Sequence, residues 1–513
     1  MRTLFNSQAK TVTFAAALLA ASALTSRILG LARDRLLASR FGAGQDLDIY
    51  FAAFRIPDFV YGILIMGGLS AVFMPVFAEY IKKDEKEGWR LVSVILNCFL
   101  ILLIALCGIL AILTPWLIKL IVPGFDSEQK ALAVSLTRIM FLSPIFFGLS
   151  SIFSGVLHYF NRFLAYAIAP ILYTLSIIFG IIFFVPIFGV TGLAYGVILG
   201  AFLHFVIQIP AAKASGFHYF PVFDFKYPGL LKIFKFMTLR VVGASVYNIN
   251  LIVITAIAST LAAGSIAIFS FADNLQGFPV GIVGVSFALA SFPALSKAWA
   301  NGIKEEFLES FSSTFRQVIF LIIPLSVLTF LLRTQIVEII LGGGMFTPEN
   351  VKLTAAALGL ASFGIFAFAL VPFLLRTFFS LQDVKTPTIV GLIYMVVNFV
   401  LCVSFVRLFD FLGLPLGVSL SGIIYFSLLL IFLRKKMGDI RLGEIWQSLK
   451  KIILASVLMA SAVYIVLQLM PGTIFQLVFA SAVGAIVYIL FVYLFQSPEI
   501  KTIKSSILGQ FSK

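Results

Sequence analysis

Ionisable side chains in the first two apolar stretches are the residues of this sequence best placed to do chemistry. In chain order they are Arg27, Arg33, Asp34, Arg35, Asp48, Arg55 and Asp58. A charge at membrane depth costs from ~3 to more than ~10 kcal/mol, so it normally faces a hydrated cavity or a partner. Because the cluster is mainly guanidinium, its natural ligand is an anion, and phosphate fits the planar fork. The pattern predicts a binding site for an anion that must cross a bilayer, although Arg55 and Asp58 could also pair with each other.

Some of these arginines admit a simpler interpretation. A long basic side chain near a helix end can bury its stem and extend its charge to the membrane interface. We favour this interfacial role for Arg35 and Arg40. Arg27 and Arg33 lie deeper in the apolar stretch than an interfacial residue needs to, so for these two we favour a role in binding.

The composition indicates a membrane protein with many spans. Of 513 residues, 61% are hydrophobic and 12% are charged, and the mean hydropathy is +1.09. So few charges cannot coat a soluble particle, which excludes a secreted domain or a cytosolic enzyme. The three cysteines lie in apolar runs and the three histidines have no partner at ligand spacing, so no disulfide framework, metal or other cofactor is expected. The pattern GxxxxGK[ST] is absent, so no ATP motor is expected either.

Helices must position the charged residues, because backbone in lipid has to satisfy its own hydrogen bonds. A bilayer core takes ~20 apolar helical residues, and the chain offers about fourteen such runs. The predicted fold is therefore an all-α polytopic membrane protein. The expected spans are 12–39, 48–80, 91–118, 131–157, 163–187, 190–211, 231–260, 265–297, 311–335, 352–380, 386–408, 412–434, 450–470 and 474–496.

Lysine and arginine are distributed unevenly between alternate loops. With the amino terminus placed inside, the inside segments hold roughly twenty-three of them and the outside segments about six. This asymmetry predicts that both termini are cytoplasmic. It also accounts for most of the net charge of +15, together with attraction to anionic membrane lipids, so no nucleic-acid partner is expected.

A segment of the sequence is repeated within the chain. Gly192–Gly200 recurs as Gly413–Ser421, and Phe205 recurs as Phe426 at the same spacing, which we call the repeat shift. One copy alone would indicate only a small-residue packing face. Because six helices separate the copies, the two halves should share one topology and be related by a pseudo-twofold axis along the membrane normal. We expect an amino-terminal lobe at 1–212, a second lobe at 213–437, and two extra helices with a cytoplasmic tail at 438–513.

Several motifs resemble those of the MurJ (MviN) lipid II flippases. The opening of the family is matched by Ser26–Asp34, by Phe41–Gly44, by Asp48 with Phe51, and by Ala53–Pro57. Further matches follow in order along nearly the whole chain. They are Gly68–Ser70, Phe73, Pro75, Phe77–Tyr80, Pro123–Phe125, Asn161–Phe163, Phe278–Pro279, Phe292–Ser296 and Gln382–Pro387.

The resemblance implies a fold, an activity and a site. The fold is that of the multidrug/oligosaccharidyl-lipid/polysaccharide exporters, in which the two extra helices form a groove for the lipid tail. The activity is alternating-access translocation of undecaprenyl-pyrophosphate-linked peptidoglycan precursor, lipid II, from the inner to the outer leaflet of the bacterial cytoplasmic membrane. The implied partners are lipid II, membrane lipids and the cell-wall synthesis machinery. The implied substrate-binding residues are Ser26, Arg27, Arg33, Asp48 and Arg55, with the arginines on the pyrophosphate.

The chain departs from the family at two places where further cavity cations are usual. Tyr61 and Gly62 occupy the place of a pair of arginines, and Asn274 stands where an arginine commonly follows Asp273. Two alternatives therefore stay open. The chain could export another polyprenyl-linked oligosaccharide, or it could be a membrane scaffold that does not transport.

Overall fold

A computed structural model describes residues 12–66 and 69–500 of the chain. It divides into two compact units, Met1–Ala267 and Ile268–Lys513. The described residues are helical throughout, apart from their connections and one isolated bridge between Gly343 and Phe346. The fold class predicted from the sequence is thus confirmed for these residues.

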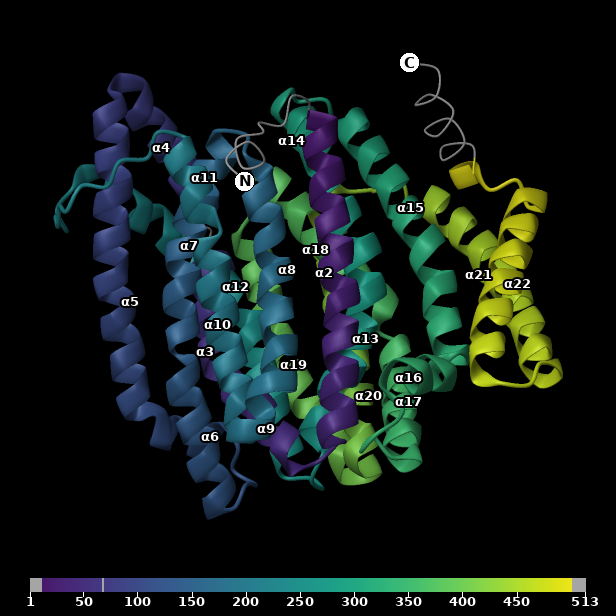
Figure 1. Cartoon of the computed structure of the whole chain (residues 1–513). Coiled ribbons are helices and arrows are strands. Elements are labelled where there is room, and N and C mark those ends of the chain that lie inside the picture. Colours follow the sequence, from purple (N-terminus) through teal and green to yellow (C-terminus); the bar gives the residue numbers. More distant parts are fainter. Residues whose placement is uncertain (1–11, 67–68, 501–513) are drawn as a thin grey trace. The chain divides into compact units, whose positions relative to one another are not determined.

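Unit 1 is a bundle of helices with mostly short connections, except for the extended segment 215–227 between α11 and α12 (Figure 1). Within it, α2 packs against α8, α3 packs against α6 and α12, and α7 packs against α5 and α10. Its helices are α2 (Val12–Phe41), α3 (Gln45–Met66), α4 (Leu69–Lys83), α5 (Glu85–Ile121), α6 (Ser127–Met140), α7 (Leu142–Tyr159), α8 (Phe163–Phe179), a π-helical turn (Gly180–Phe184), α9 (Val185–Phe188), α10 (Thr191–Val206), α11 (Gln208–Ala214) and α12 (Pro228–Ser259).

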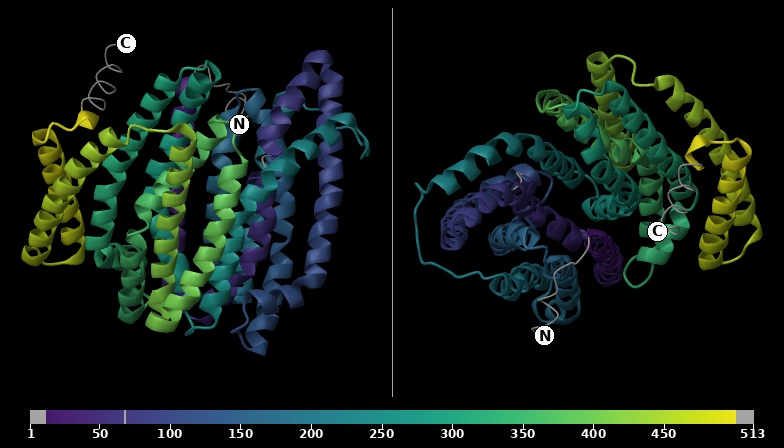
Figure 2. Two further views of the ribbon diagram at one scale, coloured as in Figure 1. Left: turned by 180° about the vertical axis from the view of Figure 1, so that it is seen from behind. Right: turned by 90° about the horizontal axis from the view of Figure 1, so that it is seen from above.

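Unit 2 begins within the first turn of α13 and ends with an antiparallel pair, α21 and α22, which lie side by side in both views of Figure 2. Its helices are α13 (Ser265–Pro279), a π-helical turn (Val280–Val285), α14 (Ser286–Ala300), α15 (Lys304–Leu331), α16 (Arg333–Leu341), α17 (Pro348–Ser362), α18 (Ile365–Ser380), α19 (Lys385–Phe409), a 3₁₀ turn (Asp410–Leu412), α20 (Gly413–Met437), α21 (Leu442–Leu469) and α22 (Thr473–Leu494).

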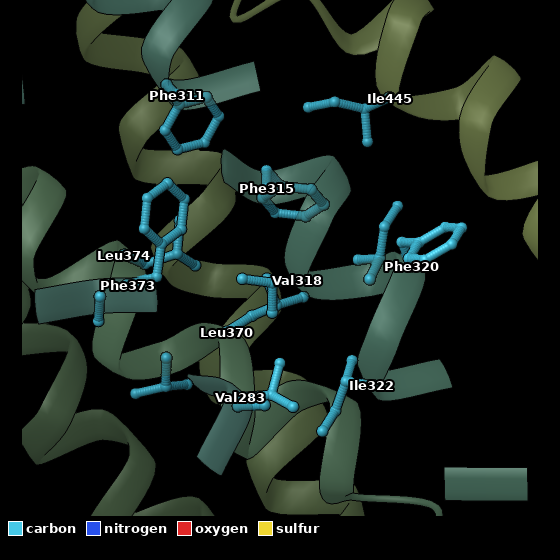
Figure 3. Close-up of a cluster of buried hydrophobic side chains, with 14 of the residues drawn as sticks. Val283, Phe311, Phe315, Val318, Phe320, Ile322, Leu370, Phe373, Leu374 and Ile445 are labelled. Atoms are coloured by element: carbon cyan, nitrogen blue, oxygen red, sulfur yellow. The ribbon is translucent and has the colours of Figure 1, made fainter. Parts of the chain in front are cut away.

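The core of unit 2 is built around α15 and α18. Phe311, Phe315 and Val318 of α15 meet Leu370 and Phe373 of α18, and all five are buried (Figure 3). The rings of Phe311 and Phe373 stack with centroids 5.3 Å apart. Since the surroundings of a membrane protein are as apolar as its core, such close packing, rather than exclusion from water, holds these helices together.

The backbone carries the repeat that the sequence predicts. Asn161 and Gln382 both adopt a left-handed conformation, with φ of 55° and 56°, and their spacing equals the repeat shift. Gly189 and Asp410 share the same spacing, with φ of 59° and 52°. A non-glycine residue rarely adopts positive φ, so this coincidence is hard to obtain by chance.

Helix starts follow the same spacing. The Asp126 carboxylate accepts the N–H of Gln129 at the start of α6, and the Thr347 hydroxyl accepts the N–H of Asn350 at the start of α17. The two caps are separated by the repeat shift, and so are the two donors. Each unit therefore contains a copy of the same helical arrangement.

The predicted spans mostly match helices, but the count of fourteen is not confirmed. Among the described residues, nine helical segments are long and apolar enough to cross a membrane, or ten if the pair α17 and α18, bent by 47°, is one span. One of the nine, 385–437, comprises both α19 and α20. The run 48–80, which we predicted as one span, contains α3 and α4 on either side of residues 67–68.

Candidate functional site

The cations predicted to bind substrate lie on α2 and α3 of unit 1. Ser26, Arg27 and Arg33 are on α2 and are each partly buried. Arg27 and Arg33 are six residues apart, so they are separated by about 9 Å along the helix axis. Arg35 and Arg40 are exposed, and their interfacial role stays a prediction.

Arg33 has a partner that the sequence analysis did not foresee. Its Nε and Nη2 both donate to Oδ1 of Asp34, over 2.9 and 2.7 Å. The Asp34 side chain is 5% exposed and that of Arg33 is 25% exposed. No counter-ion was expected for Arg33, because neighbouring residues on a helix rarely face each other. In the structure the flexible guanidinium folds back onto the carboxylate.

Arg33 and Arg55 are brought together around acidic and phenolic groups. Asp58 lies within electrostatic range of both arginines, and Arg33 is also within range of Tyr50 and Tyr173. Asp58 lies one turn beyond Arg55 on α3, and Tyr173 comes from α8. Two predicted cations therefore share one polar cluster in unit 1.

Asp48 is engaged with backbone rather than with the arginines. It is 4% exposed, and its two oxygens accept the N–H groups of Gly264 and Ala267, over 2.6 and 2.8 Å. These N–H groups are orphan donors at the start of α13, which a carboxylate satisfies well. Asp48, at the beginning of α3, thus caps the start of α13.

A close backbone contact explains the glycine beside Asp48. Gly264 has φ of +92°, and a Cβ there would lie 2.3 Å from the carbonyl oxygen of Ala43. Only glycine combines this conformation with so close an approach. The motif Phe41–Gly44 is therefore a packing motif for the loop that ends at Gly264.

Arg55 contacts a residue that sequence reasoning missed. Its Nε donates to the hydroxyl oxygen of Thr255 on α12, over 2.7 Å. Thr255 is 1% exposed. The only signal in the sequence was a polar residue inside an apolar run, which is common in membrane helices and not specific. In the parts of the chain that the structure describes, no three His, Cys, Asp or Glu side chains gather as a metal site.

Comparison with known proteins identifies the family. The profile described as "Lipid II flippase MurJ" matches residues 37–484. The chain belongs to the MurJ family. A protein of Buchnera aphidicola (subsp. Acyrthosiphon pisum), named probable lipid II flippase MurJ, is 33% identical over 91% of this chain and 94% of its own length. The lipid II flippase MurJ of Burkholderia cenocepacia is 30% identical over 80% of this chain and 82% of its own length.

Solved structures agree with this assignment. A lipid II flippase MurJ structure, described as an inward closed conformation, matches with a TM-score of 0.80 and 26% identity over 94% of this chain and 99% of that one. An inward-facing multidrug resistance transporter of the MATE family matches with a TM-score of 0.66 and 16% identity over 81% of this chain and 95% of that one, which shows a shared fold. This MurJ chain is therefore a multi-pass membrane transporter and not an enzyme.

Proposed function

We propose that this chain translocates lipid II from the inner to the outer leaflet of a bacterial cytoplasmic membrane by alternating access. The observation that carries the proposal is the family relationship, which spans residues 37–484 and is supported by the MurJ structure match. In this proposal both termini are cytoplasmic, and residues 1–212 and 213–437 act as lobes while 438–513 supply the two extra helices and the tail.

The proposed binding set is Ser26, Arg27, Arg33, Asp48 and Arg55. Arginine suits a pyrophosphate because its planar fork donates two parallel hydrogen bonds to neighbouring oxygens. The cluster of Arg33 and Arg55 around Asp58 supports a site in unit 1. Asp48 is included because its carboxylate caps the start of α13, and this contact holds the start of α3 in place.

One feature keeps a different polyprenyl-linked glycan as a second candidate substrate. Gly62 carries no side chain where the family resemblance implies an arginine, and the side-chain amide of Asn248 lies against it. A pocket with fewer cations binds a doubly charged headgroup less tightly, whereas neutral sugars would be less affected.

Complementation tests the proposal. The gene is expressed in a bacterium from which its own lipid II flippase can be depleted, and growth is measured with membrane expression confirmed by immunoblot. Growth on depletion supports lipid II transport. Lysis at normal expression would favour the other glycan or a scaffold, and accumulation of lipid II in the inner leaflet would confirm the failure.

A further inference from the structure

Helices α3 and α12 of unit 1 meet along a seam with a regular register. Arg55 of α3 contacts Thr255 of α12, and Gly62 of α3 faces Asn248 of α12. On α3, Gly62 follows Arg55 by seven residues, and on α12, Asn248 precedes Thr255 by seven residues. Since seven residues are close to two helical turns, the same faces meet twice in an antiparallel pair.

The seam is closely packed at Gly62. A Cβ added there would meet the side-chain amide of Asn248. At the end of the seam the Asp48 carboxylate holds Gly264 and Ala267. Thr255 therefore lies opposite Arg55 in a closely packed part of the seam.

The Thr255 hydroxyl is oriented by its own helix. Its proton is donated to the carbonyl oxygen of Leu251, over 2.8 Å, which leaves its lone pairs to accept the Arg55 Nε–H. A hydroxyl can donate one bond and accept others at the same time, so both contacts are compatible. The Thr255 hydroxyl therefore acts toward Arg55 only as a hydrogen-bond acceptor.

We infer that Thr255 is a positioning residue for Arg55 in substrate binding. A bond to Nε restrains the plane of the guanidinium, whose two Nη groups would then bind the anion. Asp58, within electrostatic range of Arg55, adds a second constraint on its charged end. This inference rests on the proposed function, since it gives Thr255 a role only if Arg55 holds the pyrophosphate.

The test separates loss of the hydroxyl from loss of the side chain. Thr255→Val keeps the shape and removes the acceptor, whereas Thr255→Ser keeps the acceptor. The matched control is Thr114→Val, because Thr114 is also buried and donates to the carbonyl four residues earlier, Leu110. Flipping is measured in cells depleted of their own flippase, and binding of undecaprenyl pyrophosphate is measured on purified protein by native mass spectrometry.

We expect Thr255→Val to weaken binding about tenfold, as for a lost hydrogen bond to a charged group. Thr255→Ser and Thr114→Val should stay within about twofold of the parent protein. In an Arg55→Ala background, Thr255→Val should have no further effect, because a residue that acts only through Arg55 has nothing left to position.

The outcomes are distinct. If Arg55→Ala weakens binding and Thr255→Val does not, the inference about Thr255 is overturned and the proposed site stands. If Arg55→Ala binds and flips normally, Arg55 is not a substrate residue and both assignments fail. If Thr255→Val adds its full effect to Arg55→Ala, its role is structural. Should Thr255→Val not fold, binding by Thr255→Ser and Thr255→Ala decides the same question.

Discussion

Arg27 and Arg33 occupy one helix but differ in what surrounds them. Both donor groups of Arg33 that reach Asp34 share a single carboxylate oxygen, so this arginine brings its own counter-ion into the membrane. Removing one member of a buried ion pair leaves the other charge without compensation, which costs more than losing the pair. At Arg33, therefore, effects on transport and on stability have to be measured separately.

We predict that Arg27→Ala and Arg33→Ala each reduce flipping about tenfold or more, because each removes a charge-assisted contact to a phosphate. Arg33→Ala should also destabilise the protein by ~3 kcal/mol. The double variant Arg33→Ala with Asp34→Ala should regain most of that stability without regaining transport. Flipping is assayed in depleted cells and stability by thermal unfolding in detergent, with the exposed Arg40→Ala as control. Full activity of folded Arg27→Ala and Arg33→Ala would show that these arginines are structural.

At the scale of helices, the two copies of the repeat differ in one buried contact. In unit 1, the Ser150 hydroxyl lies 2.8 Å from Nδ1 of His204, and Gln208 donates its amide to Ser150 over 2.6 Å. Ser154 donates to the Gln208 side-chain oxygen over 2.9 Å, which completes a network between α7 and α10–α11.

The equivalent positions in unit 2, one repeat shift further along the chain, are apolar or aromatic. They are Val371, Leu375, Tyr425 and Leu429, and all four lie in its hydrophobic core or pack against it. The same helix pair therefore packs with or without the polar network. Pro210, next to the network, has Ile431 as its counterpart, and α10 is interrupted at Ile207 where α20 is continuous.

This comparison predicts a non-additive mutant series. Ser150→Val alone should destabilise the protein by ~1–3 kcal/mol, because it removes the partner of the His204 Nδ1 and one of the two acceptors of the Gln208 amide nitrogen. The fourfold variant Ser150→Val, Ser154→Leu, His204→Tyr and Gln208→Leu copies unit 2 and should be less destabilised than the single one, since an incomplete polar network is worse than an apolar contact. Thermal unfolding of the two proteins decides the point. A fourfold variant that is clearly less stable than Ser150→Val would refute it.

A second element-scale contact lies in the connection between α18 and α19. Asp383 accepts the N–H and the hydroxyl of Thr386, and the Lys436 ammonium at the end of α20 lies 2.6 Å from its carboxylate. Partial burial works against the charged carboxylate, but the contacts with Lys436 and Thr386 outweigh it and lower the pKa of Asp383 below its ordinary value of 3.8. The connection is therefore held by a carboxylate that stays ionised.

The sign of the resulting pH dependence follows from the lowered pKa. Because the folded pKa lies below the unfolded value, the stabilisation is complete above pH 3.8 and disappears as the pH falls through the folded pKa. We predict that Asp383→Asn is less stable than the parent protein at neutral pH and that the difference shrinks below about pH 4. Thermal unfolding across pH 3–7 measures it, with the exposed Glu309→Gln as control. A difference that is constant across this range would show that the charge is not responsible.

For the molecule as a whole, hydropathy and the internal repeat predicted most of the helices, because both can be read directly from the amino-acid sequence. Runs of apolar residues located α19 to within one residue at each end, whereas α5 begins at Glu85, before its predicted run 91–118. The breaks inside predicted spans, as at Phe141 between α6 and α7, could not be predicted, because a helix interior and a bent helix have the same hydropathy.

The site was only partly predictable for a related reason. Residue type located Arg33 and Arg55, since an arginine in an apolar helix stands out. The hydrogen-bond partners of these two arginines could not be predicted. Asp34 is adjacent to Arg33 and would ordinarily face away from it, and Thr255 lies 200 residues from Arg55. Such contacts depend on rotamers and on which helices pack together, which the sequence pattern does not contain.

Two contacts within the units bear on the topology across the membrane. Lys436 meets Asp383 although α19 and α20, each 25 residues long, lie between them. In unit 1, the Arg162 Nη2 donates to the carbonyl oxygen of Ala214 over 2.7 Å, across α8 to α11. In each case the two ends of the intervening helical hairpin are in contact, so the hairpin runs out and back. If these hairpins span the bilayer, both ends of each lie on one side, and the distribution of basic residues predicts that this is the cytoplasmic side.

We predict that Lys213 and Lys435, when replaced by cysteine, react with an impermeant maleimide only after the cytoplasmic face is exposed. Phe188→Cys and Leu408→Cys, at the opposite ends of the same hairpins, should react in intact cells. All four positions are exposed, and the native cysteines Cys98, Cys107 and Cys402 are buried, so background labelling should be low. The positive-inside rule sets the direction, and the contacts of Arg162 and Lys436 set the pairing. Labelling of Lys435→Cys from outside would reverse the orientation, and labelling of Lys213→Cys and Lys435→Cys from opposite sides would show that the two copies of the repeat do not share one topology.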